Sequence, residues 1–185
     1  EGETAAAYRN EKTLAWYGKA DALISPSKHL ARLAEEHDLG PVHVIPHGLE
    51  AHWFNPSHRA AANLPFVHIG TISFHKGTDR VVHAWREACD GRGPELQLYG
   101  PVLEPEAAAS HPVGPILNAQ DVLSTLQNAR ALVLGARWAE NAPLIILEAR
   151  AAGCPIIAPD IGGISEIIED GVDGILHRSD DELVA

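Results

Sequence analysis

The chain has 185 residues, of which 45% are hydrophobic and 21% charged, and its formal net charge is -11. This length suits one well-cored domain with an appendage, and the composition excludes a disordered chain. No apolar run reaches the roughly 18 residues of a membrane span, and the acidic balance argues against a general affinity for nucleic acid or anionic membrane. Two cysteines, no secretory signal and no Met favour a cytoplasmic piece of a longer protein.

Short apolar runs alternate with helical patterns along the chain. Residues 1–47 supply about two strands and two helices, too few to bury a core alone, and residues 48–65 have the small, polar and proline residues of a linker. From residue 66 onward the alternation predicts βαβ units. Because the strand runs are apolar throughout, we expect an α/β fold with a doubly wound parallel sheet covered on both faces. The expected strands lie at 20–25, 42–46, 65–70, 95–100, 131–135, 155–159 and 174–177.

Four histidines crowd the end of the first segment and the linker, namely His43, His47, His52 and His58. Their setting reads as a strand followed by a proline-broken loop, so no two of them share a helical turn as a zinc-binding helix would require. We therefore predict no metal site and no cofactor.

The first corner of interest is "IGTISFHKG", where a strand ends at Gly70 and a helix begins near Thr78. In a doubly wound sheet, ligands bind beyond the carboxyl ends of the strands. Gly70 and Gly77 permit tight turns, and Lys76 stands where it could reach an anion, although the loop by itself favours an ordinary solvated lysine. The chain has neither G-x-G-x-x-G after a strand nor G-x-x-x-x-G-K-[ST], so dinucleotide and P-loop sites lose their main support.

The second corner is "PIIAPDIGGISEIIED", where a strand runs into Gly162 and Gly163 and then into a short helix containing Glu166. Paired glycines before a helix expose backbone N–H groups that can hold a phosphate or a cluster of hydroxyls. Such pairs also simply turn the chain, and the local sequence leaves both interpretations open.

The third corner is "ENAPLIILEARAAG". Asn141 is a good N-cap and Pro143 suits the first helical position, which predicts a helix over about 143–152. Glu140 then lies just outside the helix N-terminus, where unpaired N–H groups favour a negative charge. This placement explains Glu140 without any ligand, so its function is open at this point.

Glu148 lies inside the same apolar helix, directly after "LIIL". A buried carboxylate without hydrogen-bond partners costs several kcal/mol. Either Arg150 or another basic group pairs with it, or a polyhydroxyl ligand does, and the pattern does not choose between these alternatives.

These residues together give the chain a resemblance to retaining GT-B glycosyltransferases of the family 4 type. Glu140 and Glu148 stand at the spacing of that family's E-x7-E signature, and the following strand and G-G-x-x-E loop are also similar. Upstream, "VIPHGLEAHWFNP" resembles the family's linker, "IGTISFHKG" its first corner and "ELQLYGP" its next strand. The five motifs occur in the family's order between residues 21 and 176, which implies the Rossmann-like C-terminal half of a GT-B fold.

The resemblance implies a binding site for a nucleotide-diphosphate sugar donor. Glu148 would hold the ribose hydroxyls, Glu140 would face the transferred sugar, and Lys76 would bind the leaving diphosphate. The base would lie near Tyr99, Gly100 and the segment 114–118. The backbone of the third corner, together with the first and second corners, would complete the site through Gly70, Thr71, Asn141, Ala142, Pro143, Leu144, Gly162 and Gly163.

The implied function is retaining, metal-independent transfer of a sugar to a hydroxyl acceptor, by the whole enzyme. The segment 1–47 would be the end of the N-terminal domain, 48–65 the linker and 66–185 the donor domain without its closing helix. The acceptor would be bound mainly by the missing N-terminal domain, so we expect this chain alone to be inactive.

One departure from the family is Thr71, which stands where the usual motif has an arginine. This substitution removes half of the cationic clamp on the diphosphate. It motivates one alternative to the transferase, a non-catalytic module that binds a nucleotide sugar. A separate alternative is a GT-B relative that acts as an epimerase or a phosphorylase.

Overall fold

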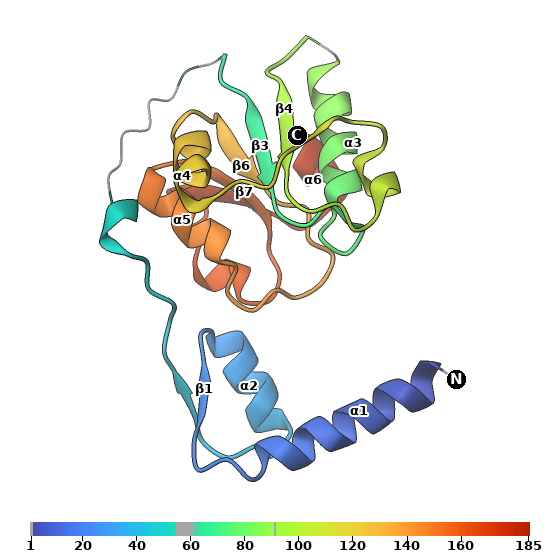
Figure 1. Cartoon of the computed structure of the whole chain (residues 1–185), viewed down its shortest axis with the longest axis vertical. Coiled ribbons are helices and arrows are strands. Elements are labelled where there is room, and N and C mark those ends of the chain that lie inside the picture. Colours follow the sequence, from blue (N-terminus) through green and yellow to red (C-terminus); the bar gives the residue numbers. More distant parts are fainter. Residues whose placement is uncertain (1, 55–60, 62, 91) are drawn as a thin grey trace. The chain divides into compact units, whose positions relative to one another are not determined.

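The computed structural model describes residues 2–54, 61, 63–90 and 92–185. The chain divides into two compact units, Glu1–His47 and Gly48–Ala185 (Figure 1). Residues 55–60 and 62 of the expected linker, and with them His58, lie outside the described residues.

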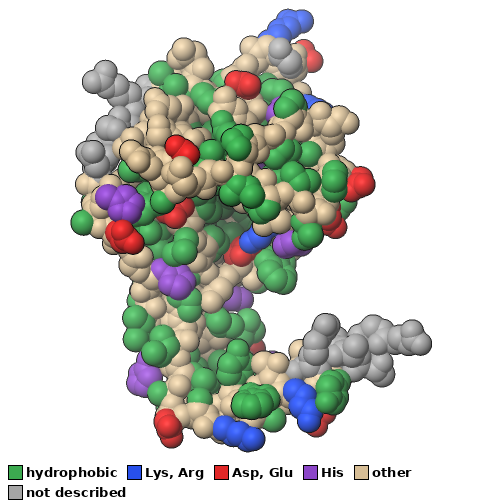
Figure 2. All heavy atoms as spheres, in the orientation of Figure 1, with side chains coloured by type: hydrophobic (Ala, Val, Ile, Leu, Met, Phe, Trp, Pro, Cys, Tyr) green, Lys and Arg blue, Asp and Glu red, His purple; other side chains and the backbone are tan. Residues whose placement is uncertain are grey.

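The first unit contains the two helices and two strands that its sequence predicts. Its strands pair in parallel, and its second helix begins where the Ser27 hydroxyl accepts a hydrogen bond from the Leu30 N–H at 3.1 Å. Between helices and strands lies an apolar groove of about 370 Å³, and hydrophobic side chains are visible on the surface of this unit (Figure 2). The unit thus leaves apolar surface uncovered. Its elements are α1 (Gly2–Tyr17), β1 (Leu23–Ser25), α2 (Lys28–Glu36) and β2 (Val42–Val44).

The second unit is built on a six-stranded parallel sheet in the order β5-β4-β3-β6-β7-β8. The expected doubly wound α/β fold is therefore confirmed. The strand order reverses between β3 and β6, and such a switch point is where ligands bind in open α/β sheets. The strands are β3 (Phe66–Ile69), β4 (Leu96–Tyr99), β5 (Val113–Gly114), β6 (Ala131–Val133), β7 (Ile156–Pro159) and β8 (Gly174–His177).

Helices cover both faces of this sheet (Figure 1). One face carries α4 (Ala119–Gln127) and α5 (Leu144–Ala152), and the other carries α3 (Thr78–Cys89) and α6 (Asp180–Val184). None of the described helices is both long and apolar enough to cross a membrane. The two-residue strand β5 was not predicted, because a strand of that length has no detectable period. The described part of this unit also contains three 3-10 turns: Ala51–Trp53, Pro105–Ala108 and Ile164–Glu166.

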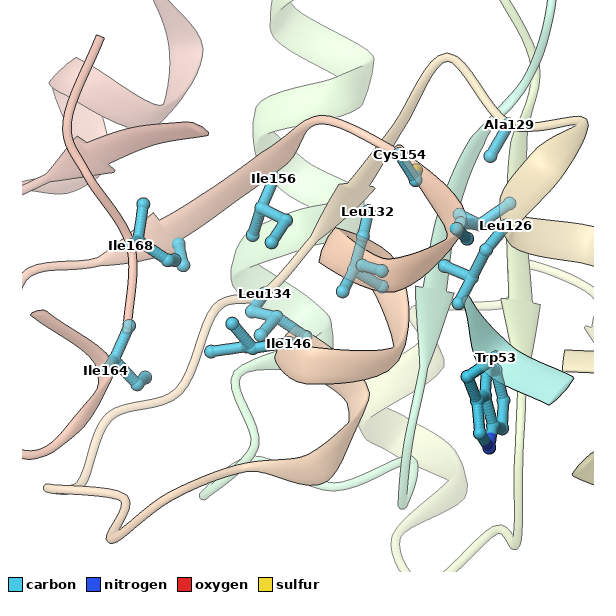
Figure 3. Close-up of a cluster of buried hydrophobic side chains, with 14 residues drawn as sticks. Trp53, Leu126, Ala129, Leu132, Leu134, Ile146, Cys154, Ile156, Ile164 and Ile168 are labelled. Carbon is cyan, nitrogen blue, oxygen red and sulfur yellow. The ribbon is translucent and has the colours of Figure 1, made fainter. Parts of the chain in front are cut away.

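The main core lies between the sheet and the layer of α4 and α5 (Figure 3). It includes Leu126 from α4 and Ile146 from α5, both fully buried. Trp53 also belongs to this core and is 5% exposed, although it comes from the segment expected to be a linker. Trp53 is the last residue of a 3-10 turn, and its burial in this core fits the division of the chain, which assigns residues 48–54 to the second unit.

The loop after β3 and the end of β6 approach each other at two glycines. Gly77 has a φ of +67°, and a Cβ placed on it would lie 1.7 Å from the carbonyl oxygen of Gly135. A Cβ on Gly135 would in turn lie 2.4 Å from the carbonyl oxygen of Gly77. Only glycine at both positions allows this backbone contact, which fixes the distance between the two loops.

Replacing Trp53 by Ala should destabilise the second unit by about 3–5 kcal/mol, because it removes a large core side chain and leaves a cavity. The neighbouring Phe54 is 66% exposed, so Phe54→Ala should change the free energy of unfolding by less than about 0.5 kcal/mol. Urea denaturation of both variants measures the difference. Equal effects would show that Trp53 does not belong to the core.

Replacing Gly77 by Ala should destabilise the chain by more than about 3 kcal/mol, because the new Cβ meets the Gly135 carbonyl as well as an unfavourable backbone conformation. Gly171 has a φ of +79° with open space around its Cβ position, so Gly171→Ala tests the backbone effect alone, at about 1–2 kcal/mol. Denaturation midpoints that match between the two variants would contradict the close approach.

Candidate functional site

The three corners singled out in the sequence follow β3, β6 and β7, which are neighbours in the sheet. Because the strands are parallel, their carboxyl ends meet at one edge, and the loops 70–77, 134–143 and 160–163 gather there. Segments up to about ninety residues apart in sequence are thus placed together by the topology of the sheet.

Specific contacts join these three loops. The Arg137 N–H donates to the His75 carbonyl at 3.0 Å, which links the loop after β6 to the loop after β3. The Gly163 N–H donates to the Glu140 carbonyl at 2.7 Å, which links the loop after β7 to the loop after β6. Lys76 Nζ lies 2.5 Å from Glu140 Oε1 in a partly buried ion pair. The two residues with the proposed sugar and diphosphate roles therefore contact each other directly.

Gly162 has a structural reason to be glycine. Its φ is +60°, and a Cβ there would lie 2.5 Å from the carbonyl oxygen of Glu140. The Gly162–Gly163 pair thus lets the loop after β7 approach the backbone at Glu140. The short helix expected after this pair is the 3-10 turn Ile164–Glu166. No side chain caps its N-terminus.

The helix of the third corner begins one residue later than predicted. Pro143 occupies the N-cap position with an extended backbone (φ -61°, ψ 119°), and α5 starts at Leu144. Asn141 is therefore not the N-cap, and that prediction is wrong: the extended backbone at Pro143 separates Asn141 and Ala142 from the helix. The side chain of Pro143 makes no hydrogen bond to the backbone N–H groups in the first turn of α5.

Glu148 lies in the middle of α5 and is half-buried. Burial raises its pKa, and the carboxylate has no hydrogen bond or ion pair with any other described residue. Arg150, the internal partner that the sequence offered, instead pairs through Nε with Asp173 Oδ2 at 2.7 Å. Arg150 is therefore not the partner of the Glu148 carboxylate.

The first corner begins with Gly70 held against the end of β4. The Gly70 N–H donates to the Tyr99 carbonyl at 2.9 Å, and a Cβ on Gly100 would lie 2.0 Å from the Gly70 carbonyl oxygen. Thr71 is partly buried, and its carbonyl accepts a hydrogen bond from the Ser73 hydroxyl at 3.4 Å. These contacts place Gly70 and Thr71 at the sheet edge beside the loop of Lys76.

A second cation near this corner is Arg137, which the sequence did not single out as a site residue. Its guanidinium forms two hydrogen bonds of 2.6 Å to the carboxylate of Asp79 and one of 2.7 Å to the Phe74 carbonyl. Although burial acts to raise the pKa of Asp79, the hydrogen bonds and charge of Arg137 keep it below its usual value. Arg137 therefore braces the loop after β3 against the first turn of α3.

The sequence also gave no role to His68, which is buried in β3 and bonded to Val133 and Thr78. The available signal was a histidine inside the apolar run "FVHI". Among the described residues, no three His, Cys, Asp or Glu side chains gather in a way that could hold a metal ion.

A family model described as "Glycosyl transferases group 1" matches residues 64–185. The chain is 26% identical to the D-inositol 3-phosphate glycosyltransferase of Nocardiopsis dassonvillei over 216 residues, covering 98% of this chain and 50% of that protein. It is 29% identical to the enzyme of the same name from Nocardia farcinica, covering 86% of this chain and 42% of that one. The chain thus spans about half the length, or less, of these relatives.

Solved structures show the same fold. Sucrose-phosphate synthase from Thermosynechococcus elongatus gives a TM-score of 0.75 at 22% identity, over 93% of this chain and 49% of that one. TarM from S. aureus, in complex with UDP among other ligands, gives 0.79 at 16% identity, over 95% and 38%. HepE from Anabaena, in complex with UDP and glucose, gives 0.70 at 20% identity, over 89% and 52%.

The sheet order, the covering helices and these structural neighbours confirm the expected Rossmann-like half of a GT-B fold. The family model covers well over half of the chain and includes all three corners of the site. The resemblance seen in the sequence is therefore confirmed, and the chain belongs to the glycosyl transferases group 1 family.

Proposed function

We propose that this chain is the donor-binding part of a glycosyltransferase that moves a sugar from a nucleotide-diphosphate sugar to a hydroxyl acceptor with retention. The observation that carries the proposal is Glu148, a half-buried carboxylate with a raised pKa and no partner among the described residues. Burying such a group without partners is costly, and a vicinal diol would supply two hydrogen-bond donors. We assign Glu148 to the ribose hydroxyls of the donor.

The ion pair at the sheet edge suits the other end of the donor. Lys76 supplies a positive charge for the diphosphate, and Glu140 beside it would face the sugar. A leaving diphosphate gains negative charge in the transition state, and a fixed cation with helix N–H groups stabilises that charge without a metal. The backbone of Asn141, Ala142, Pro143 and Leu144 leads into the first turn of α5, and Gly70, Thr71, Gly162 and Gly163 would line the remaining sides.

Two of the structural neighbours support a nucleotide-sugar ligand in this fold, since HepE is described with UDP and glucose and GtfA with UDP and GlcNAc. The acceptor would be bound mainly by parts of the protein outside this chain, which spans half or less of its relatives. Catalysis needs the acceptor hydroxyl at near-attack distance, so we expect transfer from the whole protein.

A non-catalytic donor-binding module is the second candidate, favoured by one observation. Thr71 has no charge, and the guanidinium of Arg137 is engaged with Asp79, so Lys76 would bind the diphosphate without a second cation from these positions. Transfer by the full-length protein separates the two candidates. Release of free nucleotide in that assay also distinguishes a transferase from an epimerase.

The donor site is tested by a thermal-shift panel of UDP, GDP, ADP, CDP and TDP on this chain. A ligand at one hundred times its dissociation constant stabilises the folded state by about 2.7 kcal/mol, which raises the melting temperature by about 5–11 °C. We expect one or two of the five to do so. The absence of any shift at millimolar concentration would overturn the proposed function.

Replacing Glu148 by Gln should weaken binding of both nucleoside and nucleoside diphosphate by about 1–3 kcal/mol, because charge-assisted hydrogen bonds become neutral ones. Since burial raises its folded-state pKa, the charged carboxylate disfavours folding above the pKa of the unfolded chain, and this cost disappears as the pH falls. Unliganded stability at pH 7 should therefore stay the same or rise.

Titration calorimetry and urea denaturation measure the two effects of Glu148→Gln side by side, with the exposed Glu106→Gln as the control. A sharp loss of unliganded stability with unchanged affinity would mean that Glu148 has an internal structural role and does not bind the donor.

Replacing Lys76 by Ala should weaken diphosphate binding by about 1.5–3 kcal/mol, because one charge-assisted contact to phosphate is lost. Binding of the nucleoside, which has no phosphate, should be unchanged and serves as the internal control. Equal losses for both ligands, measured by calorimetry, would place Lys76 outside the diphosphate site.

Replacing Glu140 by Gln should have the opposite effect on the diphosphate. The carboxylate competes for the ammonium group of Lys76, so its neutralisation should tighten diphosphate binding by about two- to fivefold and leave the nucleoside unaffected. In the full-length enzyme the same variant should lower kcat, because Glu140 would no longer face the sugar as an anion. Weaker diphosphate binding would show that Glu140 holds Lys76 in its binding position.

A further inference from the structure

His68 lies where the two central strands of the sheet separate. The ladder between β3 and β6 pairs Phe66 with Ala131 and Val67 with Leu132, and it ends there. The next residue, His68, is 2% exposed, and its ring Nδ1 lies 2.9 Å from the carbonyl oxygen of Val133. The imidazole therefore bonds to β6 directly beyond the point where the backbone ladder stops, at the switch point of the sheet.

The other ring nitrogen faces the loop of Lys76. Nε2 of His68 lies 3.2 Å from the hydroxyl oxygen of Thr78, which is fully buried at the start of α3. The same hydroxyl oxygen accepts the N–H of Ser73 at 3.2 Å, and the Thr78 N–H donates to the Ser73 carbonyl at 3.2 Å. This reciprocal pair closes the loop 73–78, and Lys76 is inside it.

The donors and acceptors in this chain of contacts allow one arrangement of protons. The Val133 carbonyl can only accept, so Nδ1 of His68 carries the proton and Nε2 is left to accept from the Thr78 hydroxyl. Burial lowers the pKa of His68; the hydrogen bond to Val133 opposes this, and the nearby charge of Lys76 adds to it. The two groups bonded to the ring, the Val133 carbonyl and the Thr78 hydroxyl, are uncharged.

We propose that His68 is a positioning residue for donor binding: through Thr78 it holds closed the loop that carries Lys76, and through Val133 it fixes that loop to β6. The proposal rests on the proposed role of Lys76 at the diphosphate. β6 leads directly into the loop that carries Glu140. The His68 imidazole therefore contacts both the strand before the Glu140 loop and the helix start that closes the Lys76 loop.

The second unit supplies a matched control in His177, which is 1% exposed at the end of β8. Its ring nitrogens lie 3.2 Å from the Ser179 carbonyl and 3.4 Å from the Leu134 carbonyl, and no contact joins its ring to the loop 73–78 within the described residues. His177→Asn should lower stability as a buried-histidine replacement does, without a selective effect on the diphosphate.

The test uses Thr78→Val, which removes the hydroxyl at nearly constant volume, with Thr78→Ser as the variant that keeps it. His68→Asn is the companion variant, because its amide can still donate towards Val133 but does not extend to Thr78. For Thr78→Val and His68→Asn we expect faster amide hydrogen exchange in the loop 73–77. We also expect the Kd of the diphosphate selected by the five-member panel to rise about tenfold, with less than a twofold change for its nucleoside. Thr78→Ser should stay near the parent chain.

A nitrogen-proton NMR correlation spectrum of the parent chain should show the His68 proton on Nδ1. A proton on Nε2, unchanged loop exchange in Thr78→Val, or equal losses for diphosphate and nucleoside would each overturn the proposal. If none of the five diphosphates binds the parent chain, the proposed donor site fails instead. The tautomer and the loop exchange still decide whether His68 holds the loop.

Discussion

The backbone contact between Gly77 and Gly135 is the constraint on which the site depends. It brings the loop after β3 against the end of β6 more closely than any side chain would permit. From this contact follow the bond between His75 and Arg137 and the ion pair between Lys76 and Glu140. A larger residue at either glycine would separate the two loops before any polar group was changed. The polar contacts of the site are thus set by a steric condition in the backbone.

The site has few charges for a chain with a net charge of -11. A ligand with a diphosphate would be repelled by the chain as a whole, so its attraction must be local and short-ranged. Lys76 is the proposed source of this attraction, and its ammonium group is paired with the carboxylate of Glu140. Glu148 differs, because its carboxylate has no such internal partner among the described residues. In the proposed site, Glu140 would therefore compete with the ligand for the cation, and Glu148 would bind hydroxyls.

Buried hydrogen bonds hold the loop that carries Lys76 in place. Thr78, Ser73 and His68 satisfy one another and the carbonyl of Val133 within the layer between β3 and α3. The exposed guanidinium of Arg137 also holds this loop, because it donates hydrogen bonds to the Phe74 carbonyl and to the carboxylate of Asp79. The loop of Lys76 is consequently held at both sides, which limits the conformational entropy that a ligand would otherwise have to remove on binding.

The sequence by itself determined the class of fold, the position of the three corners and the pairing of Glu140 with Glu148 in one motif. These follow from local patterns, namely apolar runs, glycines after strands and a fixed spacing, and each needs only a short window of chain. The tertiary structure alone decided that Arg150 pairs with Asp173, that Trp53 joins the core and that His68 bonds to Thr78. Partner choice depends on which distant segments the sheet brings within hydrogen-bond distance, and no local window contains that information. Even the start of α5 required the structure, because the extended backbone at Pro143 overrode the capping preference of Asn141.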